Sequence, residues 1–71
     1  MEQMEAKQYA PHQQRVVDEY SQLTEKIEKL SWFMDHDIYP TLPGIEKARM
    51  LRQYRIMLLY HEVLAERIAA F

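Results

Sequence analysis

The sequence contains no cysteine, only one glycine and only one tryptophan among its 71 residues. Without cysteine, neither disulfide bonds nor thiolate-ligated zinc can stabilise the chain, so its stability must come from packing. No apolar run approaches the roughly 18 residues that a membrane-spanning helix needs. The first residues also lack the basic and apolar segments of a secretion signal. We therefore expect a protein that stays inside the cell and does not enter a membrane.

The chain also has little excess of charge of either sign, because its net charge is only −2. A protein that binds nucleic acid through a basic surface normally shows a strong positive excess, so nucleic acid is not expected as a partner. Positive charge is nevertheless concentrated locally. Four bases and no acid occur between Lys47 and Arg55, whereas residues 1–46 hold nine of the eleven carboxylates.

Groups that could support catalysis are few and poorly placed. The two serines, Ser21 and Ser31, fall within a helical pattern and follow no strand-turn-helix elbow that would activate a hydroxyl. The segment Asp35-His36-Asp37 offers neighbouring ligands but no distant one, and no HExxH or Glu-x-x-His motif is present. We predict that the protein is not an enzyme and holds no metal or cofactor.

The apolar pattern predicts an all-α protein, a two-helix antiparallel hairpin with helices at about 12–35 and 44–70. Residues 1–11 have no apolar period and are expected to form a flexible arm before a hairpin domain at 12–71. The first helix carries a seam of apolar residues spaced four and three apart, namely Val16, Tyr20, Leu23, Ile27, Leu30 and Met34. Between the helices, Pro40, Pro43 and Gly44 mark a turn, with Thr41 as a candidate cap of the second helix.

The second helix is apolar on two sides. One stripe can face the first helix: Met50, Tyr54, Met57, His61, Leu64 and Ile68, widened by Leu51, Leu58 and Ala65. A second group, Ile56, Leu59 and Val63 with Ala70, lies on the opposite side. A helix that is apolar on both sides is normally buried on both, and one hairpin covers only the first. We therefore predict a homo-oligomeric helical bundle with Ile56, Leu59 and Val63 in the interface; a different protein partner is the alternative.

Arginines near the start of the second helix form the candidate ligand site. Arg49, Arg52 and Arg55 spread over about 120° of one face, and guanidinium groups bind phosphate or carboxylate with two parallel hydrogen bonds. Four aromatic residues in the neighbourhood could stack on a base: Trp32, Tyr39, Tyr54 and Tyr60. Two alternatives stay open. The arginines could instead pair with Asp18, Glu25 or Glu28 of a neighbouring subunit, and Trp32 and Phe33 could fold over the turn onto Ile38, Tyr39 and Leu42.

His61 lies on the main apolar stripe of the second helix. A histidine in this position is usually a core or interface residue that is hydrogen-bonded to a carbonyl or a carboxylate. If it is buried, it would be a pH-sensitive element.

From Arg15 onward the sequence resembles a family of very small phage and prophage proteins named after a crAss-like phage gene product. The residues that carry the resemblance are Glu19, Tyr20, Leu23, Ile27, Leu30 and Phe33 in the first helix and Met57, Tyr60, Leu64, Arg67 and Ile68 in the second. The resemblance covers about 55 residues, with Leu51 near its counterpart and Gln53 a looser match. It implies a phage origin and hence action in the cytoplasm of the infected bacterial host.

Small, helical, oligomeric phage proteins include sponges, which capture the nucleotide signals of bacterial immune systems without degrading them. By this architectural analogy, we predict an anti-defence protein that sequesters a cyclic or ADP-ribose-derived nucleotide. The alternative hypothesis is an adaptor or inhibitor that binds a host defence protein through Ile56, Leu59 and Val63 or through Trp32.

Overall fold

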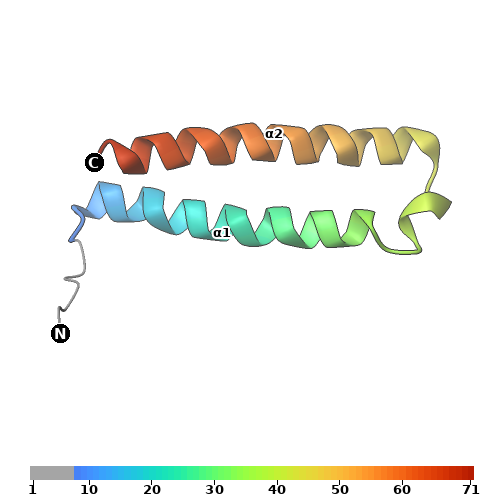
Figure 1. Cartoon of the computed structure of the whole chain (residues 1–71), viewed down its shortest axis with the longest axis horizontal. Coiled ribbons are helices and arrows are strands. Elements are labelled where there is room, and N and C mark those ends of the chain that lie inside the picture. The colour runs from blue at the N-terminus through green and yellow to red at the C-terminus, as the bar shows by residue number, and fades with distance from the viewer. Residues whose placement is uncertain (1–7) are drawn as a thin grey trace.

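The computed structural model describes residues 8–71, which form two antiparallel helices joined by a short turn (Figure 1). Helix α1 spans Pro11–Met34, a 3₁₀ turn spans Tyr39–Thr41, and helix α2 spans Gly44–Ala69. The predicted helical hairpin is confirmed, with both helix bounds within one residue of those expected. Residues 1–7 of the expected arm lie outside the described residues.

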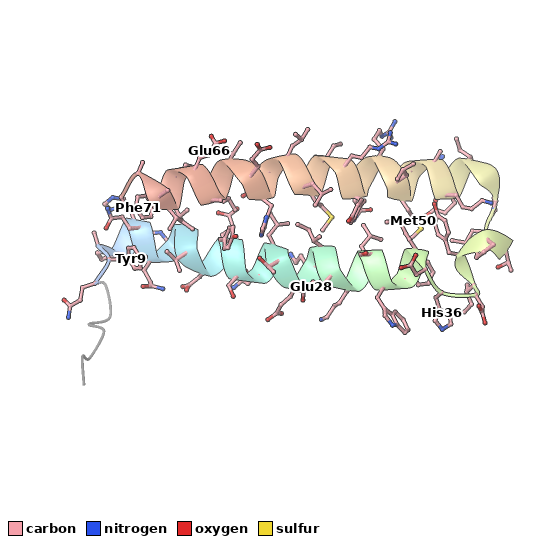
Figure 2. The ribbon with its side chains drawn as sticks, viewed as in Figure 1. Tyr9, Glu28, His36, Met50, Glu66 and Phe71 are labelled. Atoms are coloured by element: carbon pink, nitrogen blue, oxygen red, sulfur yellow. The ribbon has the colours of Figure 1, made fainter. Side chains whose placement is uncertain are left out.

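Helix α1 begins with a proline. Pro11 takes the first helical position, where its missing N–H is not needed. The backbone N–H of Ala10, just before it, donates to Oε1 of Gln13 at 2.9 Å. Close to this end, the rings of Tyr9 and Phe71 meet edge to face with centroids 5.9 Å apart. This contact joins the two ends of the described chain and closes the open end of the hairpin (Figure 2).

The turn is held by hydrogen bonds to the first residues of α2. The Tyr39 hydroxyl donates to the Lys47 carbonyl at 3.3 Å, and Nζ of Lys47 donates to the Pro40 carbonyl at 3.5 Å. The Thr41 hydroxyl donates backward to the Ile38 carbonyl at 2.6 Å. The expectation that Thr41 caps α2 is therefore wrong. The residue before α2 is Pro43, whose side chain has no hydrogen-bonding group.

The core is a single seam between the two helices. Val16, Leu23 and Leu64 are buried, and Leu64 is only 1% exposed. Partly buried side chains pack against them: Tyr20, Ile27, Met57, Ile68 and Phe71. The predicted seam of α1 and the stripe from Met50 to Ile68 of α2 are thus the faces that meet.

Leu51 and Leu58 were expected to widen the α2 stripe, but they are 38% and 41% exposed. A single helix opposite α2 covers only a narrow stripe, and these two leucines point about 80–100° away from its centre. Of the three widening residues, only Ala65 is partly buried. The described chain is one layer of two helices, measuring 51 × 27 × 16 Å.

Candidate functional site

The arginine cluster lies on the sides of α2 that α1 does not cover. Arg49 and Arg52 line an open groove of about 380 Å³ together with Gln53, Ile56 and Met57. The spacing explains this grouping, because residues three and four apart stack on one face of a helix. The groove therefore combines two guanidinium groups and an amide with apolar side chains, and no carboxylate lines it.

The charges of the cluster are largely uncompensated within the described chain. Nη1 of Arg49 lies 3.3 Å from Oε1 of Glu46, one turn earlier on the same helix, and both side chains are exposed to solvent. Arg52 and Arg55 make no ion pair or hydrogen bond with any side chain from residue 8 to 71. A solvent-exposed pair of this kind contributes little to stability, so Arg49 is also available to another anion.

Arg55 is not among the residues that line the groove. It lies about 60° around the helix from Arg52, so the two point to adjacent sides of α2. The predicted triad thus divides into a pair, Arg49 and Arg52, and a flanking third arginine.

The four predicted stacking residues are spread over different parts of the molecule. Tyr54 is partly buried on the side of α2 that faces α1, and Tyr39 belongs to the turn. Tyr60 is 43% exposed, one turn beyond Ile56. A single chain therefore does not gather these aromatic rings around the arginines.

Trp32 belongs to a second groove, on the outer face of α1. It is 66% exposed, and its ring lies 4.9 Å from that of His36. The groove has a volume of about 480 Å³ and is lined by Glu25, Glu28 and Lys29 in addition to Trp32 and Phe33. At this exposure Trp32 is not buried against Ile38, Tyr39 and Leu42, as one alternative had it, although its ring contacts His36 of the turn.

His61 lies between the helices, as its position on the stripe predicts. Its Nε2 is 2.7 Å from the Thr24 hydroxyl, and its ring stacks on Tyr20 with centroids 4.2 Å apart. The Thr24 hydroxyl also donates to the Tyr20 carbonyl at 2.9 Å. The partner is thus a hydroxyl and not the carbonyl or carboxylate that we expected.

The predicted interface residues of α2 are exposed in the single chain. Ile56, Leu59 and Val63 are 58%, 63% and 50% exposed, and Ile45 on the same side is 63% exposed. Glu66 also points away from α1 (Figure 2). Within residues 8–71, no three histidine or acidic side chains are grouped closely enough to hold a metal ion. No described helix is long and apolar enough to cross a membrane.

The fold and these surfaces define a class: a small α-helical hairpin with one basic and apolar groove on α2 and an aromatic groove on α1. Residues 10–70 match the family described as Sequestin. The chain is also 40% identical over 60 residues to an uncharacterized 7.5 kDa protein from the denB-rIIB intergenic region of Enterobacteria phage T4. That alignment covers 84% of this chain and 94% of the phage protein.

The chain therefore belongs to the Sequestin family. The expected relationship to small phage proteins is confirmed. No solved structure matches the chain.

Proposed function

We propose that this protein sequesters a nucleotide messenger of bacterial immunity in the cytoplasm of an infected host, binding it without chemical change. The family description, Sequestin, supports a sequestering role, and the T4 relative supports a role during phage infection. The observation that carries the ligand class is the groove with Arg49 and Arg52 on α2.

This groove offers what a phosphorylated nucleoside needs. Two guanidinium groups can each bind a phosphate oxygen pair, and the absence of a lining carboxylate leaves their charge available. Gln53 can donate to and accept from a base edge, while Ile56 and Met57 provide an apolar floor for the base or ribose. The volume of about 380 Å³ falls within the range of small-molecule sites.

A binding experiment tests this proposal. The full chain is titrated with a panel of cyclic dinucleotides and ADP-ribose derivatives while its thermal midpoint is recorded. Ligand that binds only the folded state raises this midpoint. The bound molecule is then released and identified by mass spectrometry, and an unchanged mass is expected because the protein sequesters its ligand and does not degrade it.

Two variants make the test specific to the groove. Arg52→Ala should lower the affinity by about ten- to a hundredfold, since a charge-assisted hydrogen bond contributes about 1.5–3 kcal/mol. Lys26→Ala removes the same charge from the exposed surface of α1 and should leave the affinity unchanged. If no nucleotide raises the midpoint, or if both variants bind equally well, the proposed function is wrong.

A second candidate function rests on the exposed Trp32. An adaptor or inhibitor of a host defence protein would use this side chain as an aromatic anchor, because buried tryptophans often dominate binding between proteins. In that case a tagged chain should recover one host protein in stoichiometric amount from infected cells, and Trp32→Ala should abolish the recovery. Nucleotide binding with full retention of affinity in Trp32→Ala would favour the first candidate.

A further inference from the structure

The outer face of α2 fits a second copy of this chain. We define the outer seam as the exposed residues that follow one another at alternating spacings of four and three, namely Ile45, Arg49, Arg52, Ile56, Leu59, Val63, Glu66 and Ala70. We propose that the outer seams of two chains pack against each other in an antiparallel, two-fold symmetric dimer. The charges along the seam favour a second copy of this chain as the partner and favour the antiparallel orientation of the two helices.

The spacing of the outer seam is that of a helix-helix interface. Positions that alternate by four and three residues stay on one side of a helix and insert between the residues of a partner helix. The second side of α2 repeats the pattern of the side that packs on α1, yet no described residue covers it. A partner with an equally long and regular seam would match it along its whole length.

An antiparallel pair brings complementary residues together at three of the four levels of the seam; at the fourth, Arg52 faces the partner's Val63. With the two-fold axis midway between Ile56 and Leu59, each of these residues faces the other in the second copy. Moving outward, Arg49 faces the partner's Glu66. Ile45 and Ala70 face each other at the two ends. Because a two-fold axis repeats every contact, each pairing occurs twice.

Residues beside the seam are complementary in the same arrangement. Arg55 faces the partner's Glu62 on one flank, and Glu46 faces the partner's Arg67 on the other. Charged residues flanking an apolar seam set the orientation and partner choice of paired helices. No residue of the seam or its flanks meets a like charge.

The parallel arrangement places like charges together. An in-register parallel pair would bring Arg49 against the same arginine of the partner, and likewise Arg52 and Glu66. Like charges facing each other across an interface are destabilising. The sequence of α2 therefore selects the antiparallel pair.

This dimer distinguishes among the three arginines. Arg49 and Arg55 face carboxylates of the partner, whereas Arg52 faces the partner's Val63. Arg52 therefore lies within the seam with no carboxylate of the partner opposite its guanidinium group. The seam shares Arg49, Arg52 and Ile56 with the groove of the proposed function. In the dimer the partner covers Ile56 and pairs Arg49, so of these two arginines only Arg52 stays available to an anion. The dimer is tested by its assembly in the absence of any nucleotide, so it can fail while nucleotide binding persists, and the reverse.

Sedimentation of the purified chain and of matched variants measures the oligomeric state. It tests whether the outer seam and its flanking charges form the interface. The unmodified chain should be a dimer or a multiple of one. Arg55→Glu should raise the dissociation constant at least tenfold, and combining it with Glu62→Arg should restore the dimer. Leu59→Glu should give a monomer, whereas Leu58→Glu, a neighbouring exposed leucine on a different side of α2, should stay dimeric. Circular dichroism checks that each variant is helical.

Cysteine cross-linking tests the direction, since the chain has no cysteine of its own. Ile45 and Ala70 lie about 37 Å apart along one helix at 1.5 Å per residue, so they cannot bond within a chain. The double variant Ile45→Cys with Ala70→Cys should form disulfide-linked dimers, whereas Ile45→Cys alone should not. A monomeric or odd-numbered assembly, cross-linking of Ile45→Cys alone, or dissociation by Leu58→Glu but not by Leu59→Glu would overturn the proposal.

Discussion

Replacing Leu64 with alanine should remove most of the stability of the hairpin. Leu64 is 1% exposed and lies in the group of three buried side chains with Val16 and Leu23. Leucine-to-alanine changes at such sites cost about 2–5 kcal/mol, since they lose the transfer free energy of the side chain and leave a cavity. A core in a chain of this length rarely supplies more than about 3–5 kcal/mol. The variant should therefore be largely unfolded at 37 °C.

The matched control is Leu58→Ala, the same chemical change at a position that is 41% exposed. Surface substitutions usually change stability by no more than about 0.5 kcal/mol, and alanine is the better helix former. Urea titrations followed by far-ultraviolet circular dichroism would compare the two unfolding midpoints at equal protein concentration. Equal midpoints for the two variants would refute the assignment of the core to the Val16, Leu23 and Leu64 seam.

Two further predictions concern the middle of the hairpin and the outer face of α1. Thr24→Val keeps the shape of the side chain but leaves Nε2 of His61 without its partner, so it should cost about 1–2 kcal/mol in urea titrations. Ser21→Ala on the exposed side of the same helix should cost less, and equal losses would contradict the role of the hydrogen bond. Trp32, the single tryptophan, should fluoresce at long wavelength and be quenched by iodide because it is exposed; protection from iodide in the unliganded chain would contradict this placement.

The helices and their facing sides could be predicted because they follow from local periodicity. The seam from Val16 to Met34 has one possible partner in a chain with a single turn, so the hairpin and its core face follow directly. The width of that face could not be predicted. Leu51 and Leu58 are as apolar as Leu64, and their exposure depends on how far around α2 a single opposing helix reaches.

Details of the turn and the chain ends depend on backbone geometry that the pattern does not encode. Thr41 has the right residue type for a cap, but the 3₁₀ turn directs its hydroxyl back to the Ile38 carbonyl. The ring contact between Tyr9 and Phe71 joins residues from opposite ends of the sequence. No local signal marks such a pair, so the sequence predicts only a flexible arm at residues 1–11.

The candidate site was predictable in part for the same reason. Arg49 and Arg52 share a groove because their spacing of three residues is itself a helical neighbour relation. Closeness in sequence does not predict the aromatic partners, because α2 turns Tyr54 toward α1 and Trp32 lies on α1.

A hairpin of this kind can make a ligand site and an interface from the same helix face, because the face changes character along its length. The first half of the outer side of α2 is basic, with Arg49, Arg52 and Arg55, and the second half is apolar and acidic, with Leu59, Val63 and Glu66. Antiparallel pairing sets the basic half of one chain against the acidic half of the other. An anionic ligand at Arg52 would then lie near the partner's carboxylates. Its affinity should therefore depend on how completely Arg49 and Arg55 neutralise those carboxylates by pairing with them. Assembly and ligand binding would be thermodynamically linked through these three arginines, and each would alter the other to the same extent.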